Sequence, residues 1–317
     1  MDIVLLCAGL VVLIAGGEML VRGAVAVARL IGVSPAVIGL TFVGFGTSAP
    51  ELVTSLQAGL AGAPGIAIGN VVGSNIANIL LILGLAALVR PLAVEAAAFR
   101  RDGAVLAVVS LVAVAALLTG SVERWAGALG LALLAGYITV AIRADRRRDG
   151  PVAALHEAEA ATLEAPDRPV VAAGLMLVGL GLTLAGARML VAGAVGLAQA
   201  AGLSEAVIGL TIVAVGTSMP ELVTSVMAAR RGESGVAIGN VIGSNIFNLL
   251  GILGATALVV PLAVPAEILR LDVWVMLAAT AALLVVAGTG ARITRGEGAV
   301  CVLAYGVYLG MLLAGVV

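Results

Sequence analysis

The chain has 317 residues, of which 62% are hydrophobic and only 11% are charged, and its formal net charge at pH 7 is −1. This composition is too apolar for a water-soluble domain of this length, so it excludes most classes of soluble enzyme. A helix that crosses the roughly 30 Å hydrocarbon layer needs about 20 apolar residues. Ten such stretches follow one another, and we predict an all-α membrane protein with ten transmembrane helices.

The predicted spans cover residues 3–28, 33–59, 66–88, 103–120, 123–142, 170–198, 204–229, 236–260, 272–290 and 297–316. All 17 basic residues are arginines. Basic residues gather in the cytoplasmic loops of membrane proteins. If the amino terminus lies outside, most of these arginines fall in cytoplasmic loops. We therefore expect a multi-pass protein of the plasma (inner) membrane with both termini extracytoplasmic.

The sequence contains an internal duplication. Residues 39–84 align without a gap on residues 209–254, at an offset of 170, and 30 of 46 positions are identical. Each copy belongs to a group of five spans, and because five is an odd number the second group must enter the membrane from the opposite side. This predicts two inverted five-helix repeats, 1–142 and 170–317, with a site between them near mid-membrane.

Residues 143–169 form the one sizeable polar connection and contain the single histidine, His156. The segment is too short for a regulatory domain and lacks the spacing of a helix-loop-helix calcium site. We interpret it as a cytoplasmic linker between the repeats.

Each copy of the duplicated segment places one glutamate, Glu51 or Glu221, inside an apolar span within the pattern GTSxPE. A carboxylate at that depth costs several kcal/mol and marks a functional site by default. The alternative is a glutamate that only caps a kinked helix or pairs with arginine. That alternative is disfavoured because no arginine lies at matching depth beside either glutamate.

A proline precedes each of these glutamates. Pro50 and Pro220 have no backbone N–H, so the carbonyl one turn earlier, at Gly46 or Gly216, loses its helical donor. Within the bilayer such a carbonyl is tolerated only where a cavity, water or an ion satisfies it. We expect both helices to be broken here.

Thr47 and Thr217 lie four residues before the glutamates, hence on the same helix face. Carboxylates, hydroxyls and freed carbonyls together make an all-oxygen site. Such a site suits hard cations such as calcium and sodium and does not suit metals that prefer Cys or His.

The following span reads GNVVGSNIAN at 69–78 and GNVIGSNIFN at 239–248. Ser74 with Asn78, and Ser244 with Asn248, are one helical turn apart, so we expect each pair to line a face toward the glutamates. The remaining amides fit cation binding and interhelical hydrogen bonding equally well: Asn70, Asn75, Asn240 and Asn245.

The other charged residues have ordinary interpretations. Glu18 and Arg22 are spaced to pair along the first helix. Charges near the ends of spans are unremarkable: Asp102, Glu123, Glu267 and Asp272.

These motifs resemble the sodium/calcium exchanger family of the cation/calcium exchanger superfamily, whose two alpha-repeats carry GTSxPE followed by GNxxGSNxxN or an aspartate variant. The resemblance covers both repeats and the ten-span plan. It implies that calcium is held by Glu51, Glu221 and the carbonyls of Thr47 and Thr217. It implies flanking sodium sites and central amides at these positions: Ser48, Ser74 and the carbonyl of Gly44; Ser218, Ser244 and the carbonyl of Ala214; Asn78 and Asn248.

Two positions depart from the family pattern. Several relatives have aspartate at one of the positions held here by Asn78 and Asn248, and relatives usually have alanine where Gly44 stands. With two glutamates as its only ionised groups the site carries −2, which one calcium or two sodium ions neutralise. A potassium requirement is therefore disfavoured, and the ion stoichiometry stays open.

The sequence thus predicts a secondary active antiporter that exchanges Ca²⁺ for Na⁺ by alternating access, with no cofactor, no nucleic-acid partner and a functional monomer in the lipid bilayer. A proton/calcium exchanger, or one for another divalent cation, is the main alternative. A cation channel is disfavoured because two facing carboxylates would hold calcium too tightly for fast conduction. An intramembrane hydrolase is disfavoured because HExxH is absent and the histidine lies outside the spans.

Overall fold

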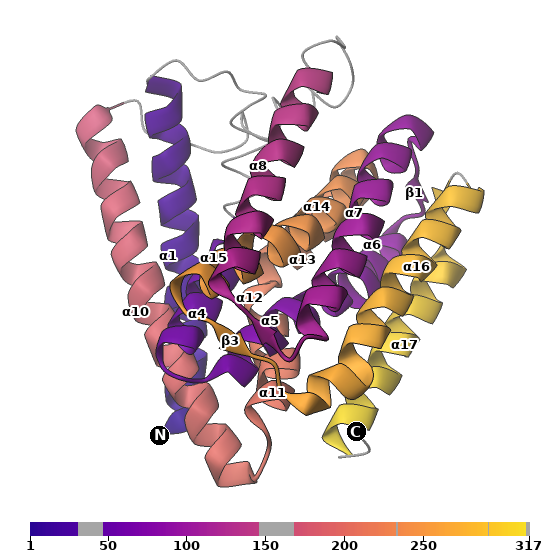
Figure 1. The fold of residues 1–317 in the computed structure, drawn as a ribbon. Helices are drawn as coiled ribbons and strands as arrows, with labels where there is room; N and C mark the ends of the chain where they lie inside the picture. Colours follow the sequence, from indigo (N-terminus) through magenta and orange to yellow (C-terminus); the bar gives the residue numbers. More distant parts are fainter. Residues whose placement is uncertain (31–46, 146–167, 233, 291, 315–317) are drawn as a thin grey trace.

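The computed structural model describes residues 1–30, 47–145, 168–232, 234–290 and 292–314 (Figure 1). Apart from connecting turns and loops and two pairs of two-residue strands, these ranges are helical. The helices are α1 (Asp2–Leu30), α4 (Ala49–Leu60), α5 (Pro64–Ile76), η2 (Ala77–Leu83), α6 (Gly84–Val89), α7 (Ala96–Leu117), α8 (Arg124–Asp145), α10 (Pro169–Ala201), α11 (Glu205–Ile208), η3 (Gly209–Val213), α12 (Ala214–Thr217), α13 (Met219–Arg231), α14 (Ser234–Phe247), η4 (Asn248–Ile252), α15 (Leu253–Val259), η5 (Ile268–Asp272), α16 (Val273–Gly290) and α17 (Arg295–Leu313). The η segments are π-helical turns within longer helices. Gly44, the first residues of the 39–84 segment and most of the 143–169 linker, with His156, lie outside the described residues.

Six helices in these ranges are long and apolar enough to cross a membrane, and a seventh is added if the bent pair Glu205–Thr217 and Met219–Arg230 forms one span. Two of the other predicted spans are not long and apolar enough to count as membrane-crossing helices, each for a local reason. Helix α7 carries Arg100, Arg101 and Asp102 near its start, and α8 is apolar only over Arg124–Val140. The total of ten stays a prediction.

The outer surface is rich in large apolar side chains. Leu303 and Val307 on α17 are 69% and 65% exposed, and Val108 and Leu111 on α7 are each 60% exposed. In water such a surface would be unfavourable, whereas in a bilayer it contacts lipid chains. The apolar exterior therefore agrees with the composition.

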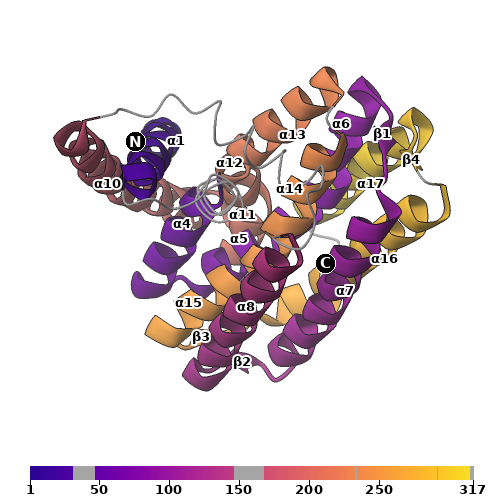
Figure 2. The same ribbon diagram turned by 90° about the horizontal axis from the view of Figure 1, so that it is seen from above.

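Helices α1 and α10 lie side by side at one edge of the molecule, where they contact each other more extensively than they contact the other helices (Figures 1 and 2). They run antiparallel, and glycines bring their backbones close together. A Cβ on Gly16 would lie 2.5 Å from the nitrogen of Thr183, and a Cβ on Gly186 would lie 2.4 Å from the nitrogen of Leu13. Gly16 and Gly186 are equivalent positions in the two predicted repeats. Farther along α1, the predicted pairing of Arg22 with Glu18 is confirmed.

Two long helices form the centre of the molecule. Most residues of Pro64–Val89, which comprise α5, η2 and α6, and of Ser234–Val259, which comprise α14, η4 and α15, are buried. The segment from α11 to η3 packs closely against α5 because Gly69 has no side chain. A Cβ on Gly69 would lie 2.8 Å from the carbonyl oxygen of Ala206 and 2.9 Å from the nitrogen of Leu210. The predicted serines and asparagines of these helices therefore lie in the protein interior, except for Asn240, which is half-buried.

The helices that carry the two glutamates both begin directly after a serine and have proline as their second residue. Helix α4 follows Ser48 with Pro50 in its first turn, and α13 follows Ser218 with Pro220 in the same position. The helix from α11 to α13 is bent by 48° at this break. The predicted interruption at Pro220 is therefore present. Before Pro50, residues 31–46 lie outside the described part.

Short strands join loops that are distant in sequence. Strand β1 (Leu92–Ala93) pairs with β4 (Arg292–Ile293), and β2 (Ser121–Val122) pairs with β3 (Leu262–Ala263), both antiparallel. Figure 1 shows β1 and β3 toward opposite ends of the helices, and both termini at the same end. Each pair joins one loop from each predicted repeat.

Candidate cation site

Glu51 and Glu221 lie in the first turns of α4 and α13 and are only 2% and 1% exposed. Each carboxylate accepts a hydrogen bond from the serine that precedes the other glutamate by three residues. Ser48 Oγ donates to Glu221 Oε1 at 2.9 Å, and Ser218 Oγ donates to Glu51 Oε1 at 2.8 Å. These reciprocal contacts bring the first turns of α4 and α13 together.

Ser74 of α5 joins this group. Its Oγ lies 3.1 Å from Ser218 Oγ. The family resemblance groups Ser74 with Ser48, whereas the hydrogen bond in the structure connects it to the serine of the second copy. Ser244 and Ala214 are buried on α14 and α12.

Asn70 supports the break at Glu51. Its Nδ2 donates to the Glu51 backbone carbonyl at 3.2 Å and to Ser55 Oγ at 2.9 Å, while its Oδ1 accepts from Thr217 Oγ1 at 3.0 Å. One buried amide thus connects the turn after Pro50 to the threonine before Pro220. For Asn70, interhelical hydrogen bonding is the role that the structure favours.

Asn240 repeats this arrangement in the second copy. Its Nδ2 donates to the Glu221 carbonyl at 3.3 Å and to Ser225 Oγ at 2.9 Å. Sequence reasoning did not single out Ser55 or Ser225. The signal was available, because in both copies the serine follows the glutamate by four residues and the asparagine follows it by 19.

The predicted central amides lie in the π-helical turns, Asn78 in η2 and Asn248 in η4, and both are almost fully buried. Segment η2 contacts α13, which carries Glu221, and η4 contacts α4, which carries Glu51. Each amide-bearing turn therefore packs against the glutamate helix of the other copy.

Several buried polar atoms at this location have no hydrogen-bond partner among the described residues: Glu51 Oε2, Glu221 Oε2, Asn78 Oδ1, and both Oδ1 and Nδ2 of Asn248. Buried oxygens normally accept hydrogen bonds, and leaving a carboxylate oxygen without one is costly. Carboxylate, amide and hydroxyl oxygens are the ligands that calcium prefers, and sodium is a hard cation of the same kind. The arrangement can hold such cations.

The fixed charge at the site comes from the two glutamates. Within the described ranges, no three Asp, Glu, Cys or His side chains gather in a way that could hold a metal ion. The remaining candidate ligands are neutral oxygens. This donor set disfavours metals that need thiolate or imidazole ligands.

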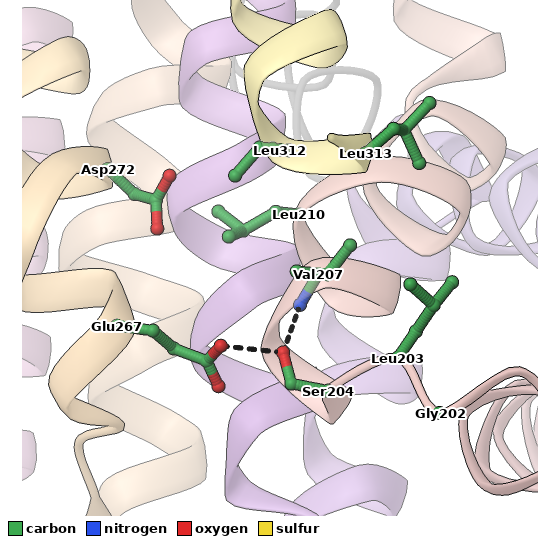
Figure 3. Close-up of a pocket in the computed structure, with 9 residues that line it drawn as sticks. All are labelled: Gly202, Leu203, Ser204, Val207, Leu210, Glu267, Asp272, Leu312 and Leu313. Atoms are coloured by element: carbon green, nitrogen blue, oxygen red, sulfur yellow. Dashed lines mark hydrogen bonds between the residues drawn. The ribbon is translucent and has the colours of Figure 1, made fainter. Parts of the chain in front are cut away.

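A cavity of about 240 Å³ lies elsewhere, between the α10–α11 turn, η5 and the end of α17 (Figure 3). Glu267 and Asp272 line it with Ser204, whose Oγ donates to Glu267 Oε2 at 2.7 Å, while Tyr308 donates to Asp272 Oδ1 at 2.8 Å. Asp272 is 1% exposed. The expectation of an ordinary charge at a span end is therefore wrong for Asp272, because α17 covers it.

Comparisons with known proteins identify the family to which the chain is similar. The family model described as "Sodium/calcium exchanger protein" matches residues 1–143 and 171–314. The chain is 39% identical to the putative antiporter CaxA of Alkalimonas amylolytica, with 94% of both chains covered. It is 35% identical to the sodium/calcium exchanger MaX1 of Methanosarcina acetivorans, with 98% of both covered.

One membrane relative and one solved structure extend the comparison. The chain is 37% identical to the inner membrane protein YrbG of Escherichia coli, over 81% of this chain and 79% of the relative. It superposes on the sodium-calcium exchanger NCX_Mj, whose crystals were soaked with Na⁺ and Ca²⁺, with a TM-score of 0.65, 31% identity, and coverage of 98% and 97%. The likeness extends over nearly the whole chain.

Proposed function

Because the chain belongs to the sodium/calcium exchanger family, we propose that it exchanges Ca²⁺ for Na⁺ as a secondary active antiporter with one shared site at mid-membrane. The observation that carries this proposal is the pair of buried glutamates, each bound by a serine of the other copy and each with one carboxylate oxygen unpartnered among the described residues. Two carboxylates and neutral oxygens fit both ions.

We assign calcium to Glu51, Glu221 and the carbonyls of Thr47 and Thr217. Sodium would bind at flanking positions formed by these groups: Ser48, Ser74 and the carbonyl of Gly44; Ser218, Ser244 and the carbonyl of Ala214; Glu51 and Glu221. Asn78 and Asn248 would lie at the centre. Because both ions need the same two carboxylates, sodium and calcium compete, and this competition couples their movements.

Two inverted five-helix repeats would place these groups at the middle of the membrane. The reciprocal glycine contacts of α1 and α10, the two strand pairs and the common end of both termini support this arrangement. The distribution of arginines supports extracytoplasmic termini in the inner membrane. Every candidate ligand belongs to one chain, so a monomer suffices.

Alternating access would come from sliding of α1 and α10 over the remaining helices. This pair lies at one edge, and α10 contacts α4, which carries Glu51 (Figure 2). A site with two uncompensated carboxylates in a medium of low dielectric constant is costly to move. The slide therefore requires bound cations, which enforces exchange.

The test is calcium uptake into proteoliposomes that contain the purified protein, driven by an outward sodium gradient at clamped pH. We expect saturable, sodium-dependent uptake that Glu51→Gln and Glu221→Gln each abolish. Glu18→Gln is the matched control, because Glu18 is exposed and pairs with Arg22 on α1.

The rival functions give different results in the same vesicles. A proton/calcium exchanger would respond to a pH gradient and ignore sodium. A channel would conduct calcium without a counter-ion and without saturation. Normal exchange by either glutamine variant would rule out the shared site.

A further inference from the structure

Two equivalent asparagines of the repeated motif make different contacts. Asn75 and Asn245 occupy the same position in their copies, at the offset of 170. Asn75 Nδ2 donates to the carbonyl of Val71 in its own helix at 2.7 Å, whereas Asn245 Oδ1 accepts from Nδ2 of Asn78, in the other copy, at 3.0 Å. Both residues are buried, so solvent does not explain the difference.

The contact between Asn245 and Asn78 determines which end of the Asn78 amide is available. An amide offers a carbonyl oxygen that can bind a cation and an NH₂ group that repels one. The hydrogen bond to Asn245 uses the NH₂ group of Asn78. Its Oδ1 is buried and has no partner among the described residues.

The reverse orientation would have the opposite effect. If Asn245 donated to Asn78 Oδ1, that oxygen would be occupied and the NH₂ group of Asn78 would be exposed to the bound ions. Electrostatics favours the first orientation whenever a cation is nearby. Asn248 has no such support in the described part of the chain, where neither of its amide atoms is bonded.

We propose that Asn245 is a positioning residue for ion exchange: its side-chain oxygen holds the Asn78 amide so that the Asn78 carbonyl oxygen serves as a cation ligand. This inference rests on the exchange function proposed above and names a specificity determinant of that site. Asn245 acts through Asn78, and the equivalent Asn75 does not act on Asn248.

The experiment compares Asn245→Ala, Asn245→Asp and the matched control Asn75→Ala in the sodium-driven calcium uptake assay. Aspartate has the shape of asparagine, and in its ionised form it only accepts hydrogen bonds, so it keeps Asn78 in place. We expect Asn245→Ala to raise the KM for sodium about tenfold, as the loss of one ligand oxygen in a buried site would. Asn245→Asp should keep this KM at or below the wild-type value, and Asn75→Ala should change it less than about twofold.

A double-variant cycle separates positioning from packing. If Asn245 acts only through Asn78, then adding Asn245→Ala to Asn78→Ala causes no further rise in KM. Asn245→Leu, which fills the same space without an acceptor, replaces the alanine variant if that variant does not fold.

Equal losses for Asn245→Ala and Asn245→Asp, additive effects with Asn78→Ala, or an equal loss for Asn75→Ala would each overturn the proposal. Absence of sodium-driven uptake by the wild-type protein would instead overturn the proposed function.

Discussion

The two copies of the duplicated motif hold their glutamates in the same way but treat their central amides differently. In each copy a serine donates to the other copy's glutamate, and an asparagine, Asn70 or Asn240, donates to a glutamate carbonyl. The copies diverge at Asn75 and Asn245. Equal residues thus give equal hydrogen bonds to the two glutamates, and unequal hydrogen bonds nearer the π-helical turns.

Serine substitutions test the symmetric part and carry the largest expected effect. Ser48→Ala and Ser218→Ala each remove a hydrogen bond to a buried carboxylate and a candidate sodium ligand. A bond to a charged group contributes about 1.5–3 kcal/mol, so exchange should fall about tenfold to a hundredfold in both variants. Sodium-driven calcium uptake measures the loss.

Ser218→Ala should lose somewhat more, because Ser218 also contacts Ser74. A loss in only one serine variant would contradict the reciprocal arrangement of the two copies. Ser110→Ala is a suitable control, since Ser110 is buried on α7 and its hydroxyl has no hydrogen-bond partner among the described residues.

The glycines of α1 and α10 test whether the symmetry extends to the outer helices. Gly16→Ala and Gly186→Ala would each place a methyl group at a similar short distance, 2.5 Å and 2.4 Å, from a backbone nitrogen of the partner helix. Overpacking of this kind costs about 1–3 kcal/mol, so both variants should lower the melting temperature in detergent by similar amounts. Gly181→Ala, with no described atom within 4 Å of its added Cβ, should leave it unchanged. A fall in only one of the two would argue against an equivalent pair.

Much of the glutamate site could be predicted from the sequence. Glu51 and Glu221 stand out because carboxylates are costly within apolar spans, and the predicted odd number of spans per repeat implies that the two GTSxPE motifs meet. Pro220 predicts the bend that the structure has. Local chemistry and the duplication together suffice for these features.

The partners of the asparagines could not be predicted in this way. Asn70 bonds to Thr217 across 147 positions, and Asn78 bonds to Asn245 across 167. Such contacts depend on how distant helices rotate against each other, and the two copies, being nearly identical here, predict the same contacts for Asn75 and Asn245. The π-helical turns at Asn78 and Asn248 also have no signal in the residue pattern.

Asn70→Ala and Asn240→Ala test whether the equivalent asparagines position the glutamates in both copies, and their expected effect is of intermediate size. Each variant removes two hydrogen bonds donated by a side-chain amide, and Asn70→Ala also removes the acceptor of Thr217. We expect exchange to fall about tenfold, as a loss of about 1–2 kcal/mol implies. The KM values for both ions should rise while the protein stays folded in size-exclusion chromatography. Unchanged KM values would show that these amides do not position the glutamates.

The smallest expected effect concerns two aspartates at equivalent positions, Asp102 and Asp272. Tyr137 donates to Asp102 at 3.3 Å, and Arg101 also pairs with Asp102. Asp272 is more deeply buried, and Tyr308 donates a hydrogen bond to it, while the described ranges contain no ion pair to Asp272. Tyr308→Phe should therefore lower the free energy of unfolding by about 1 kcal/mol, while Tyr137→Phe should lower it by less than about 0.5 kcal/mol.

Thermal unfolding in detergent distinguishes these outcomes, and adding Asp272→Asn to Tyr308→Phe should recover part of the loss, because a neutral amide is less costly to bury than a carboxylate. Equal losses for the two tyrosine variants would mean that Arg101 contributes nothing to Asp102. In that case the ion pair would not be what distinguishes the two aspartates, and the clearest differences between the copies would be those near the glutamates, at Asn75 and Asn245 and at the Ser218–Ser74 contact.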